Sequence, residues 1–171
     1  MKKRALLISI LLHALLLIVV YVFQGVIFPF LRLSGLVPLL LPIACTGIAL
    51  YEGRDTGGVA GLFAGILCDV SFNQPVGVFT VFLTLTGLIV GTLAETVILR
   101  GFVTYFLSCV VVLIISVFIQ MFPMLVFDRF PMQLMIGIAI QQTIYSLFLA
   151  LPIWFFIRAL GRFAERTPSI F

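Results

Sequence analysis

The chain of 171 residues is 63% hydrophobic and only 9% charged, whereas a soluble domain carries roughly 25% charged residues. So few charges cannot build a surface that faces water, which excludes a soluble globular domain and predicts a surface that faces lipid. The net charge of +4 comes from basic residues scattered at the ends of apolar stretches, so it does not indicate nucleic-acid binding.

Six apolar stretches follow one another along the chain, separated by turn-forming and charged residues. They are Ala5–Gly25, Leu36–Tyr51, Thr56–Val70, Val76–Ala94, Phe102–Phe127 and Met132–Ile157. A membrane span takes about 20 apolar residues, so six spans would use roughly 120 residues and leave only short loops. We therefore predict an all-α, polytopic membrane protein with six transmembrane helices in one compact bundle, forming a single domain over residues 1–171.

The first stretch follows Lys2, Lys3 and Arg4 and so resembles a secretory signal peptide. It is longer than the usual signal core of about 7–15 residues, and no small-residue cleavage site follows it. We therefore expect a retained first helix.

Lysine and arginine counts predict the orientation, because these residues concentrate in cytoplasmic loops. With six spans and an inside amino terminus, eight basic residues lie inside, namely Lys2, Lys3, Arg4, Arg54, Arg100, Arg158, Arg162 and Arg166. Only Arg32 and Arg129 lie outside. If the short third stretch did not cross, the two sides would carry equal numbers, so we expect six spans and cytoplasmic termini.

Prolines mark several helix ends. Pro75 follows Asn73 and Gln74 in the turn between the third and fourth stretches, where it suits the first turn of the fourth helix. Further prolines inside or near the ends of the spans are expected to kink helices. These are Pro38, Pro42, Pro123 and Pro152.

Glycines form a stripe on the third stretch. Gly57, Gly61 and Gly65 recur every four residues, and Gly87 and Gly91 continue a matching small-residue stripe on the fourth. Small residues at this spacing allow close approach of helix backbones in lipid. We predict that the two helices pack together, and the stripe serves either this packing or the binding of a partner.

Asp69 ends the third stretch, where the helix dipole disfavours a negative charge. The start of the fourth helix would attract it. We therefore expect the carboxylate to accept backbone N–H bonds near Gln74–Gly77 and to hold the turn. A solvated loop carboxylate is the alternative.

Other polar groups in the spans are few. His13 is the only histidine, and neither a metal-ligand set nor a catalytic motif accompanies it, so we predict no enzyme activity, metal or cofactor. A packing role with a hydrogen bond to a neighbouring helix is expected for His13, with a functional role as the alternative. Gln120, Gln141 and Gln142 either bond between helices, which we favour, or line a cavity.

The segment from Gly61 to Asp69, followed by Pro75 and Gly77, resembles the signature of the MreD family of bacterial rod shape-determining membrane proteins. Gly65, Asp69 and Gly77 fit that signature. Gly87 and Gly91 fit its next, glycine-bearing helix. Outside residues 57–91 the likeness is one of hydropathy, length and short loops.

The resemblance implies a non-enzymatic scaffold in the bacterial cytoplasmic membrane. MreD-type proteins partner the bitopic protein MreC in the elongation machinery, which links MreB filaments to peptidoglycan synthesis by RodA and its transpeptidase. The family is also similar in architecture to the substrate-binding subunits of energy-coupling-factor transporters. A small-solute, vitamin-type binding subunit is therefore the alternative function.

Overall fold

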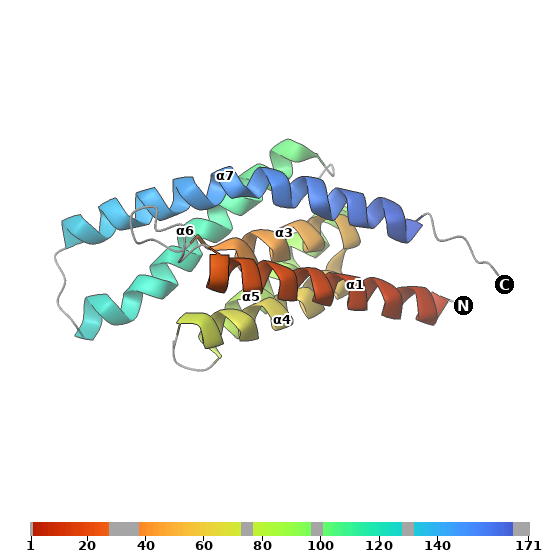
Figure 1. Ribbon diagram of the computed structural model, residues 1–171, viewed down its shortest axis with the longest axis horizontal. Coiled ribbons are helices and arrows are strands. Elements are labelled where there is room, and N and C mark those ends of the chain that lie inside the picture. Colours follow the sequence, from red (N-terminus) through yellow and green to blue (C-terminus); the bar gives the residue numbers. More distant parts are fainter. Residues whose placement is uncertain (1, 28–37, 73–76, 97–100, 128–131, 166–171) are drawn as a thin grey trace.

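The computed structural model describes residues 2–27, 38–72, 77–96, 101–127 and 132–165 (Figure 1). Over these residues the chain is helical, without strands. Its elements are α1 (Lys2–Val22), the π-helical turn η1 (Phe23–Ile27), α3 (Leu40–Glu52), α4 (Arg54–Phe72), α5 (Val78–Thr96), α6 (Phe102–Phe127) and α7 (Met132–Glu165). The predicted all-α class with six helices is confirmed for this part of the chain.

Among the described residues, three helices are long and apolar enough to cross a membrane. They are α5, residues Phe102–Phe122 of α6, and residues Ile136–Ala159 of α7. Ile10–Gly25 and Leu40–Glu52 form shorter apolar helices. The crossing of all six helices stays a prediction.

Helix α3 lies at the centre and contacts α1, α4, α5, α6 and α7. Every residue from Leu40 to Leu50 is buried, because the helix is apolar on all sides and other helices surround it. Its 13 residues extend about 20 Å, less than the roughly 30 Å of a bilayer core. The second predicted stretch is therefore helical over a shorter length than expected.

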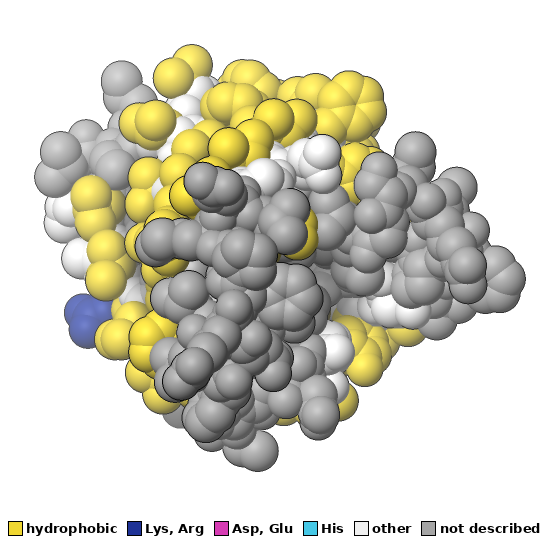
Figure 2. Space-filling view, turned by 90° about the vertical axis from the view of Figure 1, so that its left-hand side faces the viewer, with side chains coloured by type: hydrophobic (Ala, Val, Ile, Leu, Met, Phe, Trp, Pro, Cys, Tyr) yellow, Lys and Arg dark blue, Asp and Glu magenta, His cyan; other side chains and the backbone are white. Residues whose placement is uncertain are grey.

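The other helices pack around α3 in two groups. Helix α4 packs most extensively against α5, whereas α6 packs mainly against α7 and α3. The amino end of α1 and the carboxyl end of α7 lie at the same end of the molecule (Figure 1). Seen from the opposite end, the described side chains around the rim are mostly hydrophobic (Figure 2).

Three details differ from the sequence predictions. Helix α4 extends two residues beyond the predicted stretch at each end, to Arg54 and Phe72. Pro42 is the third residue of α3 and so lies in its first turn. The N–H groups of a first turn have no partner within the helix, so the proline removes no helical hydrogen bond and does not kink α3. Helix α5 begins at Val78, so Pro75 precedes the first turn it was expected to occupy, and it lies outside the described residues.

Candidate functional site: the α4–α5 pair

The glycines of α4 and α5 lie inside the contact between these two helices. A methyl group on Gly61 would overlap the backbone of Leu83, and one on Gly65 would overlap the backbone of Thr80. Side-chain-free positions therefore let the two backbones touch, as close packing in lipid requires.

The same relationship holds further along the pair. A methyl group on Gly87 would overlap the backbone of Gly57, and one on Gly91 would lie 2.6 Å from the Cα of Arg54. The five glycines of the predicted stripe thus face the backbones of neighbouring helices. Their role toward a partner protein stays a prediction.

Asp69 lies in the last turns of α4 and is 7% exposed. Its carboxylate accepts the backbone N–H groups of Gly77, Phe79 and Thr80 at 3.0, 2.9 and 3.2 Å. The Thr80 hydroxyl donates a fourth bond to the same carboxylate, at 2.6 Å. The prediction that Asp69 accepts N–H bonds near Gln74–Gly77 is confirmed at Gly77, whereas the other two N–H donors lie further along, in α5, and the solvated alternative is wrong.

The physical reason is the start of α5. The first N–H groups of a helix have no partner within it, and their dipoles favour a negative charge. Asp69 supplies both an acceptor and a charge from the preceding helix. Gly77, which precedes α5, has a φ of 103°, a backbone conformation that favours glycine. Because this conformation is not helical, Gly77 does not belong to α5, which starts at the next residue, Val78.

Glu95 makes the reverse connection, which the sequence analysis missed. Near the end of α5, its Oε1 accepts the backbone N–H of Arg54, the first residue of α4, at 2.8 Å. Each of these antiparallel helices thus contributes an acid near its carboxyl end that caps the amino end of the other. The sequence did contain a signal for this cap. Glu95 is an acid in the last turn of a helix, where the helix dipole disfavours a negative charge, as it does for Asp69 in α4.

The amino end of α3 is capped from two other elements. Oε1 of Gln24, in η1, accepts the N–H groups of Leu40 and Leu41 at 3.0 and 3.3 Å. Ser146 of α7 accepts the N–H of Leu39 at 2.9 Å. These buried bonds satisfy the start of a helix that lies inside the protein, where water cannot do so.

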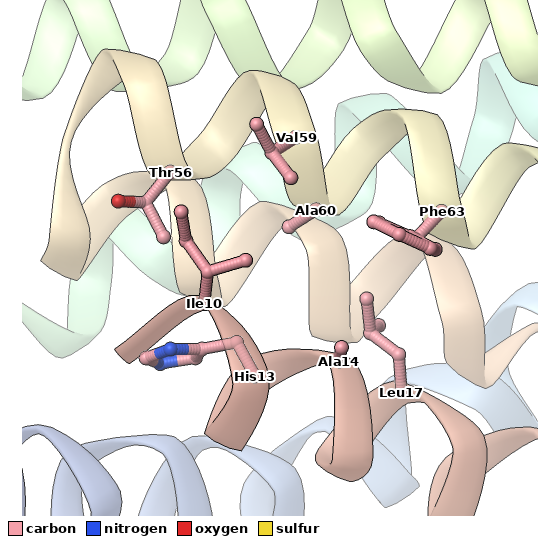
Figure 3. A pocket seen from close by; sticks show the side chains of 8 residues that line it. All are labelled: Ile10, His13, Ala14, Leu17, Thr56, Val59, Ala60 and Phe63. Atoms are coloured by element: carbon pink, nitrogen blue, oxygen red, sulfur yellow. The ribbon is translucent and has the colours of Figure 1, made fainter. Parts of the chain in front are cut away.

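His13 is buried on α1, and its Nε2 lies 3.8 Å from a carboxylate oxygen of Glu52 at the end of α3. It lines a small cavity of about 10 Å³ between α1 and α4, with Thr56 and Phe63 on the opposite wall (Figure 3). The predicted packing of His13 against a neighbouring helix is confirmed by this contact, whereas 3.8 Å is too long for a hydrogen bond, so the predicted hydrogen bond is not made by these two atoms.

The remaining polar candidates separate into two kinds. Nε2 of Gln142 on α7 donates to Oε1 of Gln120 on α6 at 3.2 Å, so the predicted bonding between helices is confirmed for this pair. Gln141 instead has an exposed side chain. The three cysteines of the chain, Cys45, Cys68 and Cys109, are buried.

The comparisons with known proteins bear on the family of the chain. The family model described as rod shape-determining protein MreD matches residues 3–164. The chain belongs to the MreD family. Searches of curated proteins and of solved structures gave no match.

Membership in the MreD family confirms the resemblance carried by Gly65, Asp69 and Gly77 and extends it over nearly the whole chain. It makes this chain a rod shape-determining membrane protein, in agreement with the three helices long enough to cross a membrane. The likeness to energy-coupling-factor subunits stays a prediction.

Proposed function

We propose that this MreD-family protein is a non-enzymatic scaffold of the bacterial cell-elongation machinery. In this proposal the chain is one membrane domain that crosses the cytoplasmic membrane six times. It binds an MreC-like bitopic protein and, through that complex, acts with RodA, its transpeptidase and MreB filaments. No cofactor or metal takes part.

The observation that carries the proposal is the joining of α4 and α5 at both ends. Asp69 and Glu95 cap opposite ends of the pair, and glycines let the backbones touch between them. A scaffold binds its partner best with a surface that already has its bound shape, because little conformational entropy is then lost on association. The α4–α5 pair is built to supply such a surface.

The outward face of this pair is apolar. Leu62 and Ile66 of α4 and Val81 and Leu85 of α5 are exposed. Such a face suits the bilayer and the transmembrane helix of a bitopic partner. We assign the partner contact to this face, with Asp69 acting on it indirectly by holding the turn.

The orientation rests on two observations. The amino end of α1 and the carboxyl end of α7 lie at one end of the molecule, as an even number of crossings requires (Figure 1). The excess of basic residues at the termini favours a cytoplasmic location for that end.

The alternative, a subunit that binds a small solute, needs a cavity of about 300–1,000 Å³. The cavity beside His13 holds about 10 Å³, and the one beside Trp154 and Arg158 holds about 80 Å³. Neither volume accommodates a vitamin-sized ligand.

Purification of the full chain with its neighbours tests the proposal. We expect an MreC-like protein to copurify after mild detergent extraction, and the gene to restore rod shape to cells depleted of their own MreD-type protein. A copurifying vitamin, with neither a bound MreC-like protein nor rescue of shape, would contradict the scaffold and favour the transport subunit.

A further inference from the structure

The outward side of α7 carries a continuous line of exposed residues that we call the α7 seam. It consists of Gly137, Gln141, Ile144, Phe148, Leu151 and Phe155. The spacing alternates between four and three residues, so the six residues form one stripe along a single face of the helix. One residue in this line, Gln141, is polar.

Gln141 lies within the apolar, membrane-length part of α7. It follows Ile136, the first residue of that part, by five residues, or about 7.5 Å of helix. The part of the chain that the structure describes offers its side chain no hydrogen bond, whereas the adjacent Gln142 is bonded to Gln120. A primary amide that faces lipid loses its bonds to water without replacing them, so a second protein surface is the favourable environment.

Gly137 lies one helical turn before Gln141 on the same seam. A methyl group on Gly137 would meet nothing within 4 Å. In α4 and α5, by contrast, the space beside each glycine of the stripe is occupied by the backbone of a neighbouring helix. A glycine beside a polar residue on a membrane helix permits the close approach at which amides of two helices bond.

The outer face of α6 provides the comparison. Val103, Leu107, Val111, Ile114 and Phe118 are all exposed there, and all are apolar. Contact with lipid is favourable for every side chain of such a face. The α7 seam differs from it by an unpaired amide and an open glycine, so exposure to lipid does not account for it.

We propose that the α7 seam pairs with the α7 seam of a second copy of this chain. Copies in one membrane share one orientation, so two α7 helices related by a twofold axis along the membrane normal run parallel, and each seam residue faces its own counterpart. The Gln141 amide has both donors and an acceptor, so it can bond its counterpart in the second copy. Gly137 provides the close approach, and the apolar residues pack beside it.

This proposal rests on α7 crossing the membrane, as in the proposed function, but it does not depend on an MreC-like partner. The test uses the full chain in native membranes, with single cysteines added to the buried native ones. Ile144→Cys places a thiol on the seam, and Leu107→Cys is its matched control on α6, since the two parent residues are 63% and 65% exposed. Two differently tagged copies identify the product.

After mild oxidation, we expect disulfide-linked pairs of the two tagged copies for Ile144→Cys and only the wild-type background for Leu107→Cys. Equal linkage at both positions, or linkage of Ile144→Cys only to a different protein, would overturn the proposal. The second of these results would assign the seam to another partner.

A second measurement keeps Gln141 itself under test. Energy transfer between labelled copies, titrated with lipid in vesicles, gives the dimer association constant. Gln141→Leu should weaken association by about threefold to eighteenfold, from the average to the largest effect of one hydrogen bond between membrane helices. Ile140→Leu, on a neighbouring exposed position, should leave it unchanged. Unchanged association for Gln141→Leu would contradict the proposed amide pair, whereas loss of MreC-like capture with intact dimers would contradict only the proposed function.

Discussion

Asp69 of α4 and Phe79 of α5 are joined by a bond of 2.9 Å between the carboxylate and the backbone N–H. Through this bond the carboxyl end of one helix caps the amino end of the next. Glu95 repeats the arrangement in the opposite direction on Arg54. The α4–α5 pair is therefore held at both ends by side chains and along its length by backbone contact at glycines.

The two caps should contribute independently to stability. They lie at opposite ends of helices of 19 residues, about 28 Å long, and effects of mutations that far apart usually add within about 0.5 kcal/mol. Glu95→Leu should cost about 0.5–1 kcal/mol, because the Glu95 carboxylate is exposed and accepts a single backbone N–H, that of Arg54 at the start of α4. Asp69→Leu should cost more, about 1–3 kcal/mol, because four donors lose their acceptor, and one of them, the N–H of Phe79, is buried.

Unfolding of the single and double variants in detergent measures both effects. A coupling energy well above 0.5 kcal/mol would show that the two ends act as one unit and would contradict independent capping.

Gly61→Ala should destabilise the protein by about 1–3 kcal/mol, the usual cost of overpacking, because its methyl group would overlap the backbone of Leu83. Gly25→Ala is the matched control, since a methyl group there meets nothing within 4 Å. Thermal unfolding in detergent, with membrane levels checked by blot, should separate the two. Equal midpoints for both variants would refute the backbone contact between α4 and α5.

The Gln142–Gln120 bond predicts coupling between α6 and α7. In a double-mutant cycle with Gln142→Leu and Gln120→Leu, the interaction energy should be about 0.6–1.7 kcal/mol, the range for hydrogen bonds between membrane helices. Steric trapping in bicelles gives the unfolding free energies. Strict additivity of the two single effects would mean that the bond contributes nothing to stability.

Both termini should be cytoplasmic. Reporter fusions to each end, read by an enzyme active only in the cytoplasm and another active only outside it, determine the side of the membrane. The expectation follows from the eight-to-two distribution of basic residues. A carboxyl terminus outside the cytoplasm would contradict the six-span topology.

Much of the fold was predictable because hydropathy and turn residues locate apolar helices directly. The central position of α3 was not. Its residues are apolar on all sides, and lipid and protein interior select the same residue types, so sequence cannot distinguish a buried span from an exposed one. The short length of α3 depends on Gln24 and Ser146, which lie far away in sequence and cap its start.

Asp69 was predictable as a cap because an acid at a helix end is unfavourable unless another helix start is near, and the next helix follows after a short turn. Glu95 carries the same signal, but its partner Arg54 precedes it by 41 residues. Nothing local links the two residues, and only the antiparallel packing brings them together. The distinction between Gln142 and Gln141 likewise depends on the rotation of α7 against α6.

The central claim is that the Asp69 cap holds a surface on which an MreC-like partner binds. The most direct measurement is capture of that partner by wild type, Asp69→Asn and Asp69→Leu at equal membrane levels. Asn keeps one acceptor oxygen and most of the shape, whereas Leu removes both charge and acceptor. We predict a graded loss, with wild type above Asn and Asn above Leu, and the same order in rescue of rod shape. Capture by Asp69→Leu at the wild-type level would contradict the account.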